Sequence, residues 1–351
     1  MARRLNGGRR PAPARAASSL VSIVRPVCGV EDGIELALHS GFVLDDRNYE
    51  LIFCAHELTD PAVHLVRRLM AENPAVPSRL LTGGNFSSAN PKLDNIVKSW
   101  LEIRGEWIVF CDDNVLLRPD YIGQLLAAWG PDTGVVSTVH IGSGPRNFWS
   151  EVECAFLNSY QARWHIAANM VTAGFAHGKT MLMRRSDLAS FGGIEALASE
   201  IAEDVAVTKL VRARGMTVSS TQFPVEQPIG SRSAAGVYKR QTRWACLRRK
   251  CFPLLFLPEV LSGGLFPVLA AGVLAHALGV PAGFAMGAQA AGWYGLELIF
   301  LAHAGWHIAW STFPAMIVRD LAIPVIWAMA WREGAFQWRD RPMQPSLAPD
   351  R

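Results

Sequence analysis

Short apolar runs alternate with longer amphipathic segments along the first half of the chain. Runs of strand length lie at 19–27, 49–55, 78–82 and 107–111. Between them, apolar residues recur at helical spacing in the segments 31–42, 60–73, 90–105 and 118–129. This alternation predicts a parallel sheet with helices on both faces. Ligands of such sheets bind at the carboxyl ends of the strands, so polar residues at those ends are the first candidates for a site.

The pattern continues less regularly as far as residue 221. Residues 149–169 have a helical pattern, and 178–193 predict a strand followed by a helix. A further helix is expected from about Glu203 to Gly215, and a strand at 216–221.

From residue 252 the pattern changes to long apolar segments. We expect an interfacial piece at 250–258 and membrane helices at 260–280, 281–305 and 306–331, because about 20 apolar residues suffice to cross a bilayer. Glu297 lies within the second segment, and Arg319 and Asp320 within the third. The alternative is a buried helical subdomain. A mean hydropathy of +0.17 for the whole chain favours a membrane protein.

Basic residues concentrate in two places and account for the net charge of +4. The first group precedes the first acidic residue, Glu31, and favours a disordered tail, with a targeting presequence as the alternative. Its members are Arg3, Arg4, Arg9, Arg10, Arg15 and Arg25. The second group directly precedes the apolar region and is typical of a positively charged membrane flank. Its members are Lys239, Arg240, Arg243, Arg248, Arg249 and Lys250.

These patterns divide the chain into four parts. Residues 1–18 form a basic tail, 19–250 a catalytic domain, 251–335 a membrane region and 336–351 a second tail. The six cysteines have no metal-ligand spacing and fit reduced thiols of a cytosolic domain. We therefore expect an integral membrane protein with its N-terminal domain on the cytoplasmic face and no nucleic-acid partner.

Carboxylates stand at three points where the apolar pattern breaks. Asp60 follows the strand 49–55 and opens a helix, Asp112 and Asp113 follow the strand 107–111, and Glu203–Asp204 interrupt a helical pattern. Each has a structural explanation when taken alone, such as an N-cap for Asp60.

A fourth motif favours a shared functional role for these three groups of carboxylates. In the segment RQTRW at 240–244, Arg240, Arg243 and Trp244 have the spacing (Q/R)xxRW, and the segment lies just before the apolar region. Strand-end aspartates, then Glu-Asp, then this motif, in that order, resemble inverting glycosyltransferases of the GT-A fold. The stretches NPKLDNIVKSW, CDDNV, GKTMLMRRSDL and IAEDVAVTKLVRARG narrow the resemblance to the ceramide glucosyltransferase family and its bacterial relatives that modify hopanoids.

The resemblance implies a GT-A catalytic domain, a Rossmann-like α/β fold with a mixed sheet, followed by membrane helices. With the bacterial relatives in view, we expect this catalytic domain on the cytoplasmic face of a bacterial inner membrane. It implies transfer of a hexose, most simply glucose from UDP-glucose, to the primary hydroxyl of ceramide. Asp204 takes the role of general base, with Glu203 beside it. Asp112 would contact the diphosphate and a divalent cation, Mg²⁺ or Mn²⁺, with Asn114 as a second candidate ligand.

The resemblance also assigns the remaining candidates. Arg243 and Arg240 would clamp the diphosphate, Trp244 would close the pocket, and Asp60 would hold the nucleoside. Lys92 is a candidate phosphate contact. His177, Gly178 and Thr180 fall where the family has its acceptor pocket, although a lone histidine is more often structural.

Two features leave alternatives open. Many relatives carry a DxD metal motif, whereas here position 114 is Asn, so either Asp113 or Asn114 could be the second metal contact. The sequence also permits other pairs of sugar and lipid: N-acetylglucosamine with a hopanoid, or glucuronic acid or galactose with ceramide. A non-catalytic nucleotide-binding membrane protein and a phosphohydrolase are more distant alternatives.

Overall fold

The computed structural model of the chain describes residues 19–84, 88, 90–332, 336–338 and 341–343. The predicted tail at 1–18 lies outside these residues. Within the predicted tail at 336–351, β10 (Phe336–Trp338) pairs antiparallel with β11 (Arg341–Met343).

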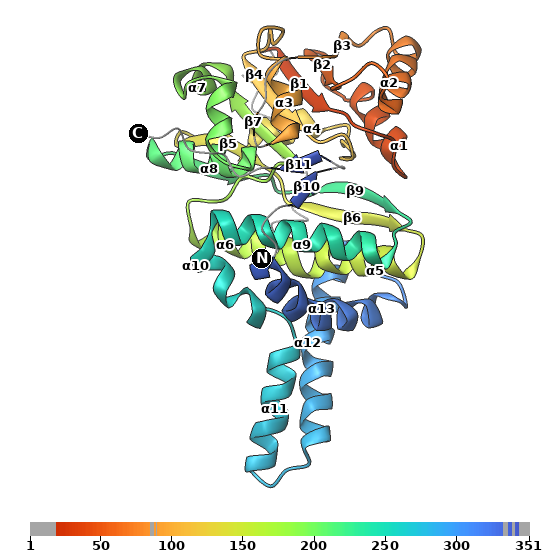
Figure 1. Cartoon of the computed structure of the whole chain (residues 1–351), viewed down its shortest axis with the longest axis vertical. Helices are drawn as coiled ribbons and strands as arrows, with labels where there is room; N and C mark the ends of the chain where they lie inside the picture. The colour runs from red at the N-terminus through yellow and green to blue at the C-terminus, as the bar shows by residue number, and fades with distance from the viewer. Residues whose placement is uncertain (1–18, 85–87, 89, 333–335, 339–340, 344–351) are drawn as a thin grey trace.

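A seven-stranded mixed sheet forms the upper part of the molecule, with strand order β3-β2-β1-β4-β7-β5-β8 (Figure 1). The strands are β1 (Val21–Pro26), β2 (Tyr49–Cys54), β3 (Ser78–Leu81), β4 (Trp107–Cys111), β5 (Thr133–Ser137), β7 (Thr180–Arg184) and β8 (Thr217–Ser220). The first four in sequence are parallel, as expected, but β7 runs antiparallel to both β4 and β5. The sheet is therefore mixed, which confirms the fold class and corrects the purely parallel sheet that the alternation predicted.

Helices cover both faces of this sheet. One face packs against α1 (Ile34–His39), α2 (Pro61–Glu72) and α4 (Tyr121–Ala127), and the other against α3 (Pro91–Val97), α7 (Arg185–Ser190) and α8 (Glu203–Ala213). In β4, Val109 belongs to the first core, and Ile108 and Phe110 to the second. A strand buried on both faces has no polar position, which explains the run WIVFC.

A second layer lies beneath the sheet (Figure 1). It contains a two-stranded parallel sheet of β6 (His140–Pro145) and β9 (Val225–Gly230), and the helices α5 (Phe148–Ala155), η3 (Phe156–Ala162), α6 (Arg163–Val171), α9 (Ala234–Cys251) and α13 (Thr312–Arg332). The continuous helix α9 carries the predicted basic group and the RQTRW motif.

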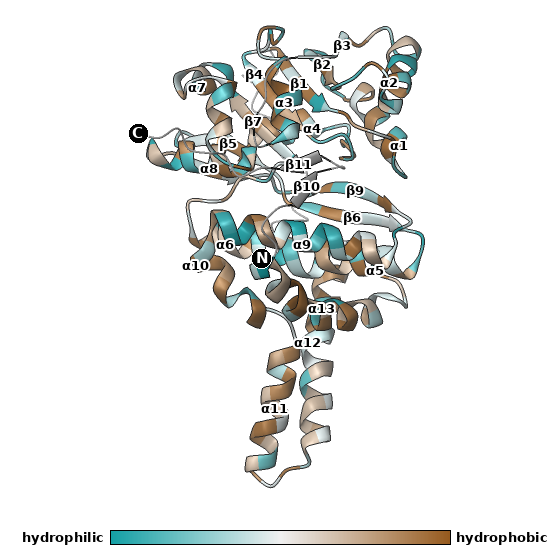
Figure 2. Ribbon diagram, in the orientation of Figure 1, coloured by the Kyte–Doolittle hydropathy of each residue, from teal (hydrophilic) through white to brown (hydrophobic). Residues whose placement is uncertain are grey.

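The hairpin formed by α11 (Leu265–Ala277) and α12 (Ala282–Ala304) projects from this layer, away from the sheet (Figure 1). Short helices α10 (Pro253–Phe256) and η5 (Leu257–Leu261) precede it. Within the described residues, only α13 is long and apolar enough to cross a membrane alone, and the segment Pro253–Ala277 passes the same test as a pair bent by 50°. Figure 2 shows few hydrophilic residues on the hairpin.

Arg25, which the sequence grouped with the basic tail, lies in β1 with its side chain fully buried. Its guanidinium donates to the carbonyl oxygens of Asp112 and Asp113, both at 3.0 Å, and of Val115 at 2.8 Å. It also donates to Ala37 O in α1 at 2.8 Å. Arg25 therefore holds the backbone of the segment that carries the candidate site, because buried carbonyls need donors.

Candidate functional site

A buried lysine joins three elements at the carboxyl end of the sheet. Lys92, in the first turn of α3, places Nζ 2.5 Å from Asp112 Oδ1 and 2.5 Å from Glu203 Oε1. The same ammonium donates to Gly178 O at 2.8 Å. Burial alone would lower the pKa of Lys92, but the two carboxylates outweigh burial and raise it above its ordinary value.

Lys179 provides a second cation on the other side of Asp112. Its Nζ lies 3.0 Å from Asp112 Oδ2 and donates to Asn114 Oδ1 at 2.7 Å. Burial raises the pKa of Asp112, yet the ammonium groups of Lys92 and Lys179 outweigh it and hold that pKa well below its usual range. The sequence predicted site roles for Gly178 and Thr180, which flank Lys179 in the chain, but not for Lys179 itself. A lysine beside a glycine at the start of a strand was a usable signal.

The two acidic residues in the first turn of α8 have different surroundings. Asp204 Oδ2 accepts from the backbone N–H of Gly178, and Oδ1 from that of Val205, both at 2.9 Å. Burial, reinforced by the charge of Glu203, raises the pKa of Asp204 to about 6 despite the opposing effect of Lys92. Glu203 is held by Lys92 and by Asn90 Nδ2, which donates to Oε2 at 2.6 Å. These contacts define the Lys92 cluster: Lys92, Asp112, Asn114, Lys179, Glu203 and Asp204.

A side chain at position 178 would crowd the charged groups of the cluster. A Cβ there would lie 2.8 Å from Glu203 Oε1, 3.2 Å from Lys92 Nζ and 3.3 Å from Asp204 Oδ2. The close approach of this backbone brings the acidic pair of α8 to the cations beside Asp112, although Asp112 and Asp204 are far apart in the sequence.

Aromatic rings lie on the side of the cluster that faces α9. The ring centroid of His177 lies 4.1 Å from that of His140 and 5.7 Å from that of His165. Trp244 of α9 meets His140 edge-on at 6.1 Å. Burial lowers the pKa of His140 and of His177 well below the ordinary value, and neighbouring positive groups add to the effect. Both rings are therefore neutral near pH 7, and they connect the RQTRW motif to the Lys92 cluster.

Asp60 and Asp113 lie at the same edge of the sheet. Asp60 Oδ1 accepts from Ala62 N, which confirms its N-cap role in α2, and from Gly29 N, both at 2.8 Å. Asp113 Oδ2 accepts from Cys28 N at 3.3 Å. The loop after β1 is thus tied to the ends of β2 and β4.

The remaining candidates lie on α9 and in the core of the sheet. Arg240 pairs with Glu153 of α5 at 3.3 Å, and Arg243 is three residues further along α9. The Thr180 side chain is fully buried, with Oγ1 3.0 Å from the hydroxyl of Tyr121, so its own hydroxyl is engaged inside the fold.

The side-chain oxygens of Asp112 and Asn114 could bind a divalent cation only if further ligands completed its coordination shell. The described residues contain no group of three or more His, Cys, Asp or Glu side chains around a common point. Asp112 and Asn114 do direct oxygens at one point, which the Lys179 ammonium occupies. Mg²⁺ commonly uses one or two carboxylates together with substrate phosphates, and the residues present fit that mode.

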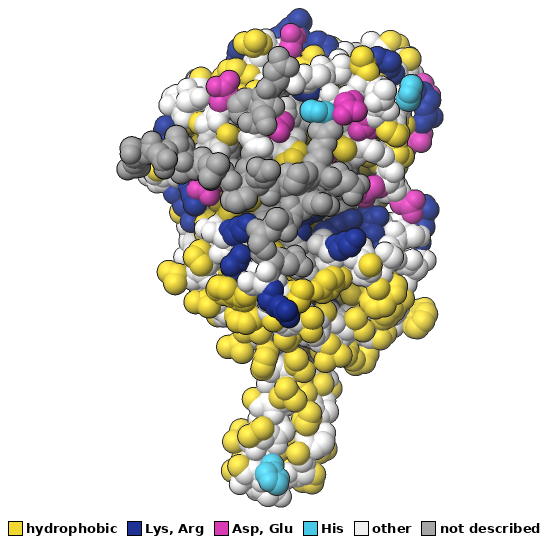
Figure 3. All heavy atoms as spheres, viewed as in Figure 1, with side chains coloured by type: hydrophobic (Ala, Val, Ile, Leu, Met, Phe, Trp, Pro, Cys, Tyr) yellow, Lys and Arg dark blue, Asp and Glu magenta, His cyan; other side chains and the backbone are white. Residues whose placement is uncertain are grey.

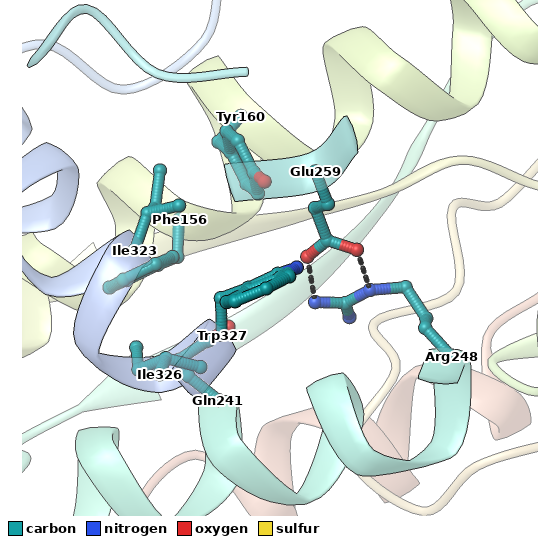
Figure 4. Close-up of a pocket in the computed structure, with 8 residues that line it drawn as sticks. All are labelled: Phe156, Tyr160, Gln241, Arg248, Glu259, Ile323, Ile326 and Trp327. Carbon is teal, nitrogen blue, oxygen red and sulfur yellow. Dashed lines mark hydrogen bonds and ion pairs between the residues drawn. The ribbon is translucent and has the colours of Figure 1, made fainter. Parts of the chain in front are cut away.

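A small pocket lies elsewhere, between α9, α13 and the segments η3 and η5 (Figure 4). Its lining consists of Phe156, Tyr160, Gln241, Arg248, Glu259, Ile323, Ile326 and Trp327. Arg248 and Glu259 form a two-contact ion pair at its mouth (Figure 4). None of its lining residues belongs to the Lys92 cluster, so it is not the candidate active site.

Comparison with known proteins assigns the chain to a family. The family model for glycosyl transferase family 21 matches residues 1–346. The chain belongs to this family. It is 26% identical to ceramide glucosyltransferase 1 of Caenorhabditis elegans over 244 residues, which cover 69% of this chain and 52% of that protein. It is 24% identical to ceramide glucosyltransferase 3 of the same organism over 328 residues, covering 91% of this chain and 71% of that protein.

The chain thus spans about half the length of the first of these family 21 relatives. Among solved structures, it resembles a mannosyltransferase, PcManGT from Pyrobaculum calidifontis, determined in complex with GDP-Man and Mn²⁺. The TM-score is 0.54 at 18% identity, covering 91% of this chain and 92% of the other. This structural similarity supports a GT-A fold for the present chain.

The Lys92 cluster generates a prediction about stability. Lys92→Met should lower the free energy of unfolding by about 3–5 kcal/mol at neutral pH, because it removes the ion-pair partner of buried Glu203 and leaves Asp112 with Lys179 alone. The pKa of Asp112 is depressed in the folded state, so this stabilisation is present above the unfolded pKa, about 4, and is lost as the pH falls below it. Urea unfolding of the detergent-solubilised protein at several pH values measures both effects.

The matched control is Lys209→Met, which removes the lysine of a surface pair with Glu200. It should change the unfolding free energy by less than about 1 kcal/mol. Equal losses for the two variants would show that Lys92 is not the buried hub described above.

Proposed function

We propose that this protein is a membrane-bound inverting glycosyltransferase that transfers glucose from UDP-glucose to the primary hydroxyl of ceramide, forming a β-glycosylceramide. The observation that carries the proposal is the Lys92 cluster. It places Asp204, whose pKa is about 6, beside Glu203, while Lys92 and Lys179 flank Asp112 at the end of β4. Family membership and the ceramide glucosyltransferase relatives point to the same chemistry.

The two carboxylate environments divide the chemical work. Asp204 is the general base: its raised pKa leaves it ionised near neutral pH yet basic enough to accept the proton of an attacking hydroxyl. That hydroxyl attacks C1 of the sugar as the bond to the diphosphate breaks. A single displacement on the face opposite the leaving group inverts the anomeric centre, so an α-linked donor yields a β-glycoside.

Positive charge is needed where the diphosphate leaves. We assign this role to Lys92 and Lys179, which flank Asp112, with Arg243 and Arg240 on α9 as the diphosphate clamp and Trp244 closing the pocket. A divalent cation held by Asp112 and Asn114 would neutralise part of the same charge. Asp60, at the same sheet edge, would orient the nucleoside.

An apolar edge beside the cluster supports a lipid acceptor. Phe175, whose carbonyl oxygen lies 3.0 Å from His165 Nε2, packs edge-on against Phe252 with ring centroids 5.3 Å apart. Phe252 precedes α10, where Leu254 and Leu255 are exposed. This edge leads from the apolar lower surface to His177 and Gly178, the proposed acceptor pocket. A ceramide could present its hydroxyl there while its chains remain in apolar surroundings.

Incubation of membranes containing the full chain with radiolabelled UDP-glucose and ceramide tests the function. Labelled β-glucosylceramide is the expected product. Asp204→Asn should reduce turnover by about 10²–10⁴-fold, because it removes the base. The control Asp132→Asn, at an exposed position before β5, should retain full turnover. Turnover unchanged in Asp204→Asn would exclude this base, and a glycosylated hopanoid or another ceramide glycoside as the product would identify a different pair of substrates.

The charge of Glu203 should set the pH dependence of this reaction. The wild-type activity should rise with pH through about 6, as Asp204 loses its proton. Glu203→Gln removes the neighbouring negative charge that helps to raise the pKa of Asp204. Its acid limb in a plot of kcat/KM against pH should therefore move to lower pH. A shift toward higher pH, or none in a variant that folds normally, contradicts this electrostatic account.

Removal of metal ions by a chelator distinguishes the contribution of a divalent cation from that of the lysines. If the cation is required, EDTA should abolish turnover and added Mg²⁺ or Mn²⁺ should restore it, while Lys179→Met should keep a measurable metal-dependent rate. Asp112→Asn should lose the metal response. Full turnover in EDTA, combined with an inactive Lys179→Met variant, would instead mean that lysines alone neutralise the diphosphate.

A further inference from the structure

The hairpin of α11 and α12 is too short to cross a bilayer. Helix α11 has 13 residues, which gives about 20 Å at about 1.5 Å per residue. In α12 the first buried residue is Tyr294, so residues 282–293 form the projecting arm and extend for about 18 Å. The hydrocarbon core of a bilayer is about 30 Å thick. A hairpin that enters from the body of the protein therefore turns inside this core.

The surface of the hairpin is apolar over most of its length, and exposed His276 near the turn is the one ionisable side chain among the described residues 265–293. No Asp, Glu, Lys or Arg occurs between positions 260 and 296. Large apolar side chains are exposed on both arms and at the turn: Leu269, Val273, Leu274, Leu278, Val280 and Phe284. Soluble proteins rarely expose an apolar patch of this extent. The turn itself, LGVP at 278–281, is apolar, whereas a turn that emerged on the far side would lie in water.

Helix α13 lies against the protein from end to end. Its buried residues recur every three or four positions over the whole helix: Thr312, Ala315, Met316, Arg319, Asp320, Ile323, Ile326 and Ala330. They face α5 and α9, and the exposed side carries Phe313, Leu321, Val325 and Trp331. Because α13 packs along its length on α5 and α9, which belong to the layer beneath the sheet, we place it beside that layer rather than across the bilayer. One face lies on the protein and the other, apolar face suits a position in the membrane plane.

The base of the hairpin has the features of a membrane interface. Trp164, Trp310 and Trp331 are exposed there, and the Arg249 guanidinium lies 5.3 Å from the Trp331 ring. Figure 3 shows Lys and Arg side chains on the body above a continuous apolar surface that extends onto the hairpin. Tryptophans at the head-group level and cations that meet anionic head groups are typical of this boundary.

The charges within the apolar region stay inside the protein at this base. Glu297 pairs with Arg163 at 2.6 Å and with Arg319 at 2.9 Å. Asp320 pairs with Arg319 at 2.8 Å, and its Oδ2 accepts from Gly264 N at 2.7 Å and Tyr294 Oη at 3.0 Å. These contacts hold both arms of the hairpin where they leave the body. They also keep the charges away from lipid.

We propose that the protein is monotopic: the hairpin enters a single leaflet from the side of the catalytic domain, turns within the hydrocarbon and returns, and α13 lies in the membrane plane. This topology replaces the three crossings expected from the apolar segments. It is independent of which sugar or acceptor the enzyme uses.

Cysteine accessibility in membranes tests the topology with the full chain. Cys28→Ser and Cys251→Ser first remove the two partly exposed cysteines. Leu278→Cys then places a thiol at the tip, and Leu36→Cys places one on exposed α1 as the control. A membrane-impermeant maleimide is added to spheroplasts and to inverted vesicles. The control should react only from the side of the catalytic domain, and the tip only after detergent is added.

A depth measurement distinguishes a buried tip from one in the opposite head-group layer. A fluorophore on Leu278→Cys should be quenched more strongly by lipids with a spin label deep in the acyl chain than by lipids with a shallow one. Labelling of the tip from the side opposite the control, or stronger quenching by the shallow label, would overturn the proposal in favour of a crossing hairpin. Labelling from the control side without detergent would show that the hairpin lies in water. None of these readouts depends on catalytic activity.

Discussion

The buried ammonium of Lys92 is the interaction on which the organisation of the site depends. A buried ammonium is costly without carboxylate partners, and the side chains of Asp112 and Glu203 provide them at 2.5 Å. These ion pairs link α3, the end of β4 and the start of α8. Gly178 completes the arrangement, because it lets the backbone of the β7 entry approach all three elements. The result is a polar centre in which Glu203 pairs with the lysine. Asp204, the next residue, is not in that ion pair and keeps a raised pKa.

Local patterns could predict the strands that carry this centre but not their mutual directions. The run at 107–111 coincides with β4, and Asp60 and Asn90 cap α2 and α3 as their positions before proline suggest. The antiparallel direction of β7 left no trace in the apolar pattern, since a strand buried on both faces looks the same in either direction. That direction brings Lys179 to the end of β4, where its carbonyl accepts from Asp112 N at 3.3 Å. The family pattern found the carboxylates, but the cations that control their pKa values depend on tertiary contacts.

The predicted helix at 90–105 and the apolar C-terminal region illustrate two further limits. Helix α3 ends at Val97, well before the predicted boundary, because turns lead the chain directly into β4. In the C-terminal region, composition does not distinguish a helix surrounded by lipid from one with a face on protein and a face on lipid. Glu297, Arg319 and Asp320 were the signal that part of this region faces protein, and their partners Arg163 and Ser159 lie in a distant part of the sequence.

Helix α9 connects the polar centre with the apolar surface. Trp244 meets His140 on one side, while Cys246 Sγ lies 3.9 Å from Ala330 O of α13 on the other. Packed helices are separated by about 8–10 Å, so the proposed membrane placement puts the centre about two helix layers, α9 and α13, above the lipid. Under this proposal, the hydroxyl of a lipid acceptor rises beside these helices rather than through them. The edge formed by α10, Phe252 and Phe175 is apolar and ends at the histidines beside Gly178. A glycosyltransferase with this arrangement could extract the head group alone, which avoids the cost of about 0.8 kcal/mol for each CH₂ group that would otherwise leave the membrane.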